Sequence, residues 1–204
     1  MKSTLFIVIF LCTCLVSLSD VMAQSGSPPM ITDDPGTPDQ GGWEINLSAA
    51  TVIRKNEKKY EVPLMDINYG LTDRIQLKFE TPYVISKIDG VPSDRNFSGF
   101  KCGIKYRFLD GDSLTASVYP QIEVPREGEE SQEYSIPVQV EKSVETFVLG
   151  SSIGYTNKEH EEDICFGSIL VGRAVSETTD IMAEIAFECI SSHFPEMEGI
   201  VNVG

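Results

Sequence analysis

Residues 60–84, YEVPLMDINYGLTDRIQLKFETPYV, consist of two alternating segments joined by a turn. In the second segment polar and apolar residues take turns: Arg74, Ile75, Gln76, Leu77, Lys78, Phe79, Glu80. This period of two places the two sets on opposite faces of a β-strand. Gly70, Thr72 and Asp73 supply turn residues between the segments. The stretch therefore predicts a β-hairpin with one apolar and one charged face. Like faces must pair, so we expect Asp66 opposite Lys78 or Gln76.

The N-terminus has the pattern of a secretory signal peptide. Lys2 precedes an apolar run over residues 5–16, and the small residue Ala23 precedes a cleavage position at Gln24. About a dozen apolar residues are too few to span a bilayer, which takes roughly 20. We therefore expect residues 1–23 to be removed and the mature chain to be exported.

Charge and cysteine content narrow the possible partners. A formal net charge of -15 argues against nucleic acid or an anionic lipid surface as a partner. Three cysteines remain after cleavage, Cys102, Cys165 and Cys189. Alternation places Cys102 and Cys189 on apolar faces and Cys165 on a polar face, so we expect no disulfide framework.

The rest of the mature chain repeats the alternating pattern. Residues 24–42 are rich in Pro, Gly and Asp and predict an irregular leader. From Trp43 onward about ten alternating strands follow, and Pro120 is out of place in a central one. Short turns follow Tyr69, Phe108, Glu141 and Arg173. The connections at the opposite strand ends, such as residues 54–59 and 86–97, are longer and charged, which is typical of outer-membrane barrels.

Two architectures share such alternation, a soluble antiparallel sandwich and a transmembrane barrel. The expected strands run about nine to eleven residues, which is the length that crosses a bilayer at a tilt. Aromatic residues such as Trp43, Tyr83 and Tyr155 lie near strand ends, as an interfacial girdle requires. The sequence therefore favours an all-β, antiparallel, up-and-down transmembrane β-barrel over residues 43–204.

Residues 30–46, MITDDPGTPDQGGWEIN, and residues 60–83 closely resemble the bacterial outer-membrane family named for the meta-pathway of phenol degradation, often described simply as transporters. The specific part is TDDPGTP, then WEIN, then NYGLTDRIQLKFETPY; the later strands match only in pattern. The resemblance implies a barrel in the Gram-negative outer membrane, in contact with its lipid, that passes small hydrophobic or aromatic solutes. It offers no catalytic residues to carry over to this chain, and we expect no cofactor.

Catalytic chemistry has little support in the sequence. His160 and His193 lie in expected loops with no cysteine at ligand spacing, so we expect no metal site and no enzyme. A Ser–His hydrolase stays open as an alternative because Ser151 and Ser152 precede His160 closely. In the leader, Asp33 and Asp34 are expected to cap a turn in preference to binding a cation.

Alternation assigns a set of charged residues to the lumen of the expected barrel. They are Asp66, Arg74, Lys78, Glu80, Lys101, Lys105, Arg107, Glu123, Glu141, Glu184 and Glu188. The basic ones come from neighbouring strands and most acidic ones from later strands. A basic wall would then oppose an acidic wall and set ion preference. The alternative is local pairing, for example of Lys78 with Asp66 or Glu80.

Two functions remain open from the sequence. One is a channel or transporter for small solutes, and the other is a sealed barrel that acts through its extracellular loops. An open sheet edge in lipid would leave backbone polar groups unsatisfied. We therefore also expect the natural chain to continue past Gly204 by at least one hairpin.

Overall fold

The computed structural model describes residues 30–54, 57–88, 93–126, 131–176, 179–190 and 197–203. No helix within these ranges is long and apolar enough to cross a membrane. The strands are β1 (Trp43–Arg54), β2 (Glu57–Thr72), β3 (Ile75–Ile88), β4 (Asp94–Phe97), β5 (Gly99–Asp110), β6 (Leu114–Val118), β7 (Gln121–Pro125), β8 (Glu133–Val144), β9 (Phe147–Lys158), β10 (Ile164–Ser176), β11 (Thr179–Ile190) and β12 (Met197–Val203). The expected signal peptide, residues 1–23, lies outside the described residues.

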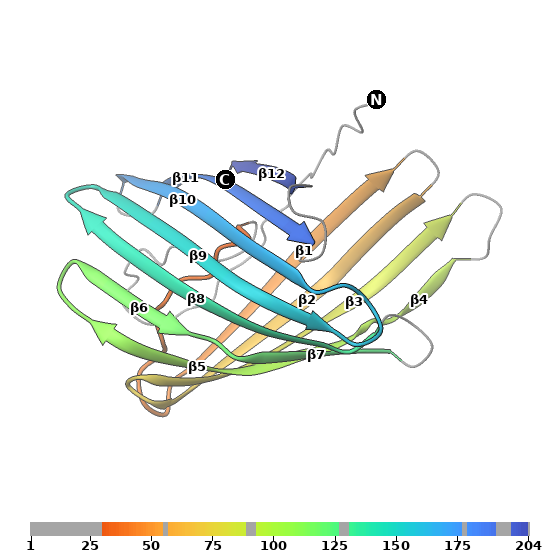
Figure 1. Ribbon diagram of the computed structural model, residues 1–204, viewed down its shortest axis with the longest axis horizontal. Helices are drawn as coiled ribbons and strands as arrows, with labels where there is room; N and C mark the ends of the chain where they lie inside the picture. The colour runs from red at the N-terminus through yellow and green to blue at the C-terminus, as the bar shows by residue number, and fades with distance from the viewer. Residues whose placement is uncertain are drawn as a thin grey trace.

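All strands belong to one antiparallel sheet of 12 strands, shown in Figure 1. The main path is β1-β2-β3-β5-β6-β8-β9-β10-β11-β12, so each strand pairs with its neighbour along the chain apart from two short strands. β4 pairs with β3 alone, and β7 pairs with β5 and β8. The all-β, antiparallel part of the prediction is therefore confirmed.

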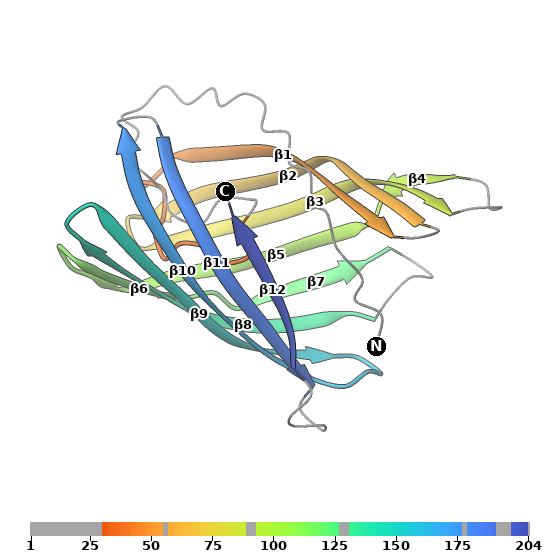
Figure 2. The same ribbon diagram turned by 90° about the horizontal axis from the view of Figure 1, so that it is seen from above.

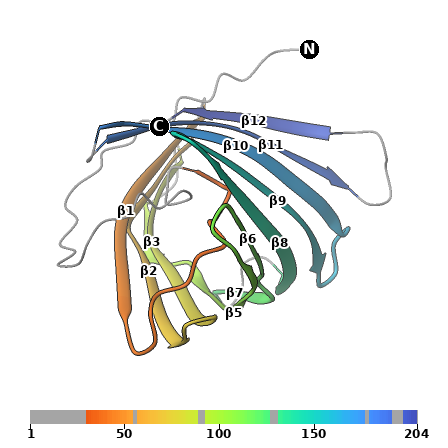
Figure 3. The same ribbon diagram turned by 90° about the vertical axis from the view of Figure 1, so that its left-hand side faces the viewer.

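The sheet curls around an interior, as the turned views show (Figures 2 and 3). The described part of the leader, residues 30–42, passes through that interior as the orange trace of Figure 3. Pairing runs continuously from β1 to β12, but no pairing between β12 and β1 joins the two edge strands within the described ranges. The sheet shown is thus a curled, open one, and closure into a barrel is not part of the observed pairing.

Burial on the two faces is the reverse of what a water-soluble sheet shows. On the convex face Ile153 and Ile185 are 66% and 62% exposed. On the concave face Lys105 and Glu184 are only 1% exposed each. Water would favour burying the apolar residues and exposing the charged ones, so the sheet keeps its polar groups inside and its apolar groups outside.

The register of the β2–β3 hairpin differs from the prediction. Asp66 lies opposite Glu80, and Lys78 lies opposite Asn68. β2 continues to Thr72 and pairs it with Ile75, with a register shift between Gly70 and Thr72. The strand runs further than expected before it turns, which moves the pairing by two residues while keeping like faces together.

Several strand boundaries also differ from the prediction. Pro120 interrupts the expected strand over residues 114–124 and divides it into β6 and β7, because proline cannot donate to the ladder. The sheet stays bonded across this break, since Tyr119 N donates to Pro137 O at 2.9 Å. The charged segments 54–59 and 86–97, expected to be loops, contain the ends of β1 and β3, the start of β2 and all of β4.

The polar face predicted for Cys165 in β10 is wrong, because Cys165 shares its face with Ile169 and Val171. Leu170 is buried on the interior face with Ser168, whereas Ile169 and Val171 are exposed on the convex face. The strand reads ICFGSILVG and is apolar on both faces, so alternation could not choose between them. For the same reason Cys165 lies directly opposite Cys189 on one face, and both are free thiols.

Candidate functional site

The register aligns the polar residues of the interior in rows across the sheet. One row is charged and joins Asp66, Glu80, Lys101 and Glu123. Another row is neutral and joins Ser117, Gln139, Ser152 and Ser168. Cross-strand neighbours on one face lie about 4.5–5.5 Å apart at their Cβ atoms, so each row is a band of interacting side chains.

The expected lumen residues differ in their degree of burial. Asp66, Lys105 and Glu184 are buried. Half-buried are Lys78, Glu80, Lys101, Arg107 and Glu141. Glu123 and Glu188 have exposed side chains towards the strand ends. Arg74 lies outside the strands, because residues 73–74 form the turn between β2 and β3, and its side chain is exposed.

A basic cluster forms where β3 and β5 meet. Lys78 and Lys105 each hold their ammonium nitrogen 5.9 Å from the centre of the Tyr119 ring. Gly103 makes this arrangement possible, because a Cβ there would lie 2.6 Å from Tyr119 Cε2 and 2.5 Å from Pro120 O. The ring therefore lies over the glycine and beside both lysines.

Asp33 of the leader joins these two lysines. Its Oδ2 lies 3.1 Å from Lys78 Nζ and 3.0 Å from Lys105 Nζ. Lys105 also donates to the backbone oxygen of Asp34 at 2.7 Å. Lys78 has a further partner in Asp66 Oδ2 at 3.6 Å. One leader carboxylate is thus shared by two ammonium groups in the interior.

The two leader carboxyls have opposite electrostatic surroundings. Burial disfavours the ionised form of Asp33, but Lys105 and Lys78 outweigh burial and lower its pKa. Burial dominates at the next residue and raises the pKa of Asp34 to about 6, because Lys105 offsets it only in part and Asp33 adds repulsion. Asp34 Oδ1 accepts a hydrogen bond from Gly36 N at 2.6 Å, so the expected turn capping is confirmed for Asp34.

The N-terminal end of the described leader is bound to the opposite side of the interior. Glu184 of β11 accepts hydrogen bonds from Ile31 N at 2.8 Å and from Thr32 N at 2.6 Å. The Thr32 hydroxyl donates to the same carboxylate and contacts Ser168 Oγ at 2.6 Å. Hydrogen bonds to a carboxylate are charge-assisted, and they are stronger than bonds between neutral groups.

The C-terminal end of the leader is fixed at the β2–β3 turn. Thr37 Oγ1 donates to Asp73 O at 2.9 Å, and Gly41 N donates to Gly70 O at 2.7 Å. A Cβ on Gly70 would lie 2.1 Å from Asp39 O, so only glycine allows the leader backbone to approach so closely. The leader therefore crosses the interior from β11 to the β2–β3 turn.

A small crevice remains beside the leader. Its lining is Thr32, Asp33, Asp34, Pro35, Val140, Glu141, Gly150 and Leu170. A Cβ on Gly150 would lie 3.8 Å from Thr32 Cγ2, so the leader nearly touches the β9 backbone here. Glu141 thus faces the leader across this crevice.

The expected opposition of basic and acidic walls is replaced by a bridged arrangement. The leader joins Lys78 and Lys105 on one side to Glu184 on the other. Local pairs also occur, since Lys78 contacts Asp66 and Lys101 Nζ lies 3.2 Å from Glu123 Oε2. The local pairing that was the alternative is therefore present, and the leader adds a link between the two sides.

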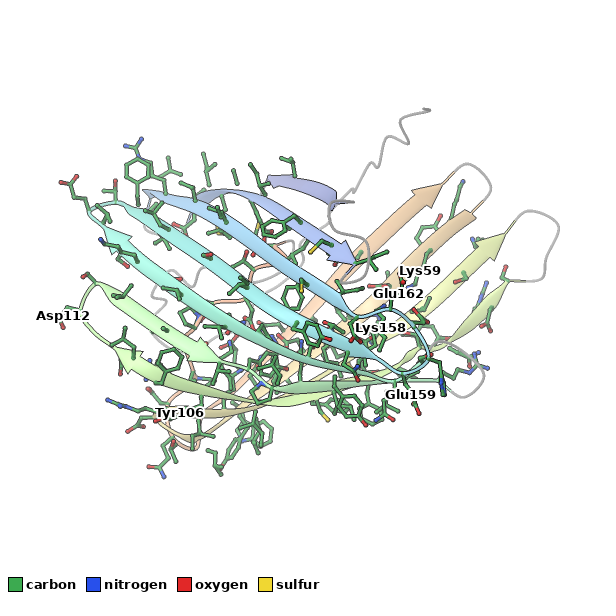
Figure 4. The ribbon with its side chains drawn as sticks, viewed as in Figure 1. Lys59, Tyr106, Asp112, Lys158, Glu159 and Glu162 are labelled. Carbon is green, nitrogen blue, oxygen red and sulfur yellow. The ribbon has the colours of Figure 1, made fainter. Side chains whose placement is uncertain are left out.

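Charged side chains lie at both ends of the sheet (Figure 4). Asp112 lies in the connection between β5 and β6, whereas Lys59, Lys158, Glu159 and Glu162 lie towards the opposite end of the sheet. At that end Lys158 Nζ lies 2.6 Å from Glu133 Oε1, and Asn157 Nδ2 donates to Asp163 Oδ1 at 2.8 Å. The first contact joins β9 to β8, and the second spans the connection between β9 and β10.

The residues of the suggested hydrolase do not meet in the structure. His160 is exposed in the turn after β9 and contacts Glu159 at 3.7 Å, whereas Ser152 is buried in the neutral interior row. His193 lies outside the described residues. Among the residues with described positions, no group of three His, Cys, Asp or Glu side chains could hold a metal ion.

Three residues of the site were not assigned to it from the sequence: Thr32, Asp33 and Tyr119. The leader has no periodicity, so nothing in its pattern predicts contacts with strands far along the chain. Alternation places Tyr119 on the same face as the buried Ser117, but only charged residues were assigned to the lumen. No protein-family model matches the chain, and no curated protein matches it.

Proposed function

We propose that this protein is an outer-membrane β-barrel that conducts small solutes, hydrophobic or aromatic ones among them, through a polar lumen narrowed by its leader. The observation that carries the proposal is the reversed burial of the two faces. Exposed isoleucines on the convex face and a buried lysine and glutamate on the concave face suit lipid outside and water inside. In the membrane the β1 edge must be paired, because an open edge in lipid leaves backbone groups unsatisfied.

Aromatic pairs at two levels of the sheet support this placement. Trp43 and Tyr69 lie with ring centres 4.7 Å apart near the short-turn end. Tyr83 and Phe97 lie 5.3 Å apart towards the opposite end. Tyr69 pairs with Leu77, six residues before Tyr83 on β3, which is roughly 20 Å along a strand. That separation is close to the height of the apolar band of outer-membrane barrels, about 25 Å.

The alternative function is a sealed barrel that acts through its loops. The specific observation in its favour is the leader, which bridges the interior from Glu184 to Lys78 and Lys105. A fixed leader would block the lumen, whereas a releasable one would gate it. The two functions therefore differ in whether solutes pass.

Liposome swelling with phenol and with sugars as solutes tests the proposal. We expect swelling with the purified chain, faster for phenol, and faster still for Asp33→Asn, which weakens the link between the leader and the lysines. Asp39→Asn makes the same change on an exposed leader residue and should behave like the unaltered protein. Folding is checked by heat-modifiable gel mobility. Folded protein that gives no swelling in any of the three forms would favour the sealed barrel.

A further inference from the structure

The cluster of Lys78, Lys105 and Tyr119 has the composition of a carboxylate site. Both ammonium groups approach the same oxygen, Asp33 Oδ2, at 3.1 and 3.0 Å. The Lys105 side chain is almost completely buried, and that of Lys78 is largely so. Two ammonium groups held around one carboxylate oxygen form charge-assisted hydrogen bonds. The chain's own Asp33 therefore demonstrates which chemical group fits there.

Tyr119 adds a polar group that the fold does not use. Its hydroxyl oxygen is buried and has no hydrogen-bond partner within the described parts of the chain. Buried polar groups nearly always have partners, so an unsatisfied one needs an explanation. A phenolic O–H beside two lysines can donate to the second oxygen of a bound carboxylate.

We propose that Lys78, Lys105 and the Tyr119 hydroxyl form a lumenal binding site for the carboxylate of a small organic acid, and that Asp33 occupies this site until such a solute displaces it. This inference rests on the proposed function, because it names a class of solute for the same lumen. Asp33 belongs to the leader, which lies outside the sheet. It can therefore leave without breaking a strand pair.

The charge of the site selects monoanions. Without Asp33 the two lysines carry two positive charges, and Asp66 at 3.6 Å from Lys78 neutralises one of them. In the adjacent row Lys101 pairs with Glu123, which leaves Glu80 to repel additional negative charge. A single bound carboxylate makes the site neutral, whereas a dianion would give it a net negative charge. The expected ligand is thus a small monocarboxylate.

Competition with Asp33 sets the apparent affinity. A tethered group acts at an effective concentration in the millimolar range. The leader also keeps its contacts at Glu184 and at the β2–β3 turn when Asp33 leaves. In the unaltered protein the concentration of a free carboxylate must therefore exceed this effective concentration before it displaces Asp33. The affinity for a free carboxylate should rise when Asp33 is neutralised.

Benzoate binding to the full chain, folded in detergent, tests the site without relying on transport. Ligand-observed NMR titration should give at least a tenfold lower Kd for Asp33→Asn than for the unaltered protein. Asp39→Asn should leave the Kd unchanged, and benzyl alcohol, the neutral analogue, should gain nothing from Asp33→Asn. Equal benzoate affinity in Asp33→Asn and the unaltered protein, or an equal gain for benzyl alcohol, would overturn the proposal.

Variants in the Asp33→Asn background identify the binding groups. Lys105→Met should abolish the gain in benzoate affinity. If that variant fails to fold, Tyr119→Phe decides, because it keeps the ring and removes only the hydroxyl. Weaker benzoate binding supports the site, and unchanged binding overturns it. Benzoate binding without solute flux in liposomes would overturn the channel and leave the site, whereas flux without benzoate binding would do the opposite.

Discussion

The β3–β5 side and the β10–β11 side of the interior hold the same leader by different chemistry. On the first side the leader contributes a side chain, Asp33, and the sheet contributes Lys78 and Lys105. On the second side the leader contributes mainly backbone N–H groups, and the sheet contributes one carboxylate, Glu184. A side-chain contact specifies a residue of the leader, whereas a backbone contact specifies only its path. Docking of the leader on the β10–β11 side therefore depends on the identity of a sheet residue, Glu184. Docking on the β3–β5 side depends on the identity of a leader residue, Asp33.

The largest effect is expected from Glu184→Ala, which removes the whole β10–β11 attachment. Glu184 accepts two backbone N–H groups and the Thr32 hydroxyl. Hydrogen bonds to a charged group contribute about 1.5–3 kcal/mol each, so the loss of three should weaken docking of this end by roughly 4.5 kcal/mol or more. Hydrogen exchange at the Ile31 and Thr32 amides measures the loss. Glu188→Ala, an exposed residue of the same strand, is the control, and equal protection in the two variants would refute the attachment.

A pH effect of intermediate size is expected from Asp34, on the other side of the comparison. The docked leader raises the pKa of Asp34 to about 6 from its usual 3.8. The docked form thus binds more protons than the undocked form between these values, so docking weakens as pH rises from about 4 to 6 and levels off above. One pKa step corresponds to a tenfold change, so the loss should not exceed about 160-fold.

The sign reverses at lower pH because of Asp33. Its pKa is lowered in the docked leader, so docking is also lost as pH falls through that lowered pKa, below the usual value of 3.8. Leader protection measured by proteolysis across this range should therefore be greatest near pH 4. Asp34→Asn should remove the decline between pH 4 and 6. Persistence of that decline in Asp34→Asn would assign it to another group.

The smallest effect is expected from Thr32→Val, which sharpens the distinction between side-chain and backbone contacts. The change removes a buried hydroxyl that contacts Glu184 and Ser168 but keeps the backbone N–H. The leader should lose about 1 kcal/mol of docking free energy. Thr37→Val, at an exposed hydroxyl bonded to Asp73 O, should cost less. An effect of Thr32→Val as large as that of Glu184→Ala would mean that the hydroxyl, not the backbone, carries this attachment.

The sequence predicts the faces of the sheet best where its two faces differ most. In β8 and β9 apolar residues alternate with Gln139, Ser152 and small residues, and the structure has the same arrangement. In β10 both faces are apolar, and the prediction was inverted there. The hairpin register depended on a bulge near Leu71, and bulges have no signature in hydrophobic alternation.

The candidate site was predictable only in part. Alternation can place Lys78, Lys105 and Glu184 on one face, because it concerns residues within strands. It cannot place the leader, whose contacts depend on the curvature of the sheet and on glycines such as Gly70 and Gly103 that make room for a second layer. The expected lumen charges were therefore considered without Asp33, the carboxylate that connects them.

The contacts of Thr32 with Glu184 have a consequence for the order of folding. They join residues 152 positions apart, from the start of the described chain to one of its last strands. Closing so long a loop costs chain entropy before any contact rewards it, and Glu184 is not in place until β11 has paired with β10. We therefore expect the leader, although it is synthesised early, to dock after the sheet has formed. Protection of the Thr32 amide would then report when the sheet has formed as far as β11.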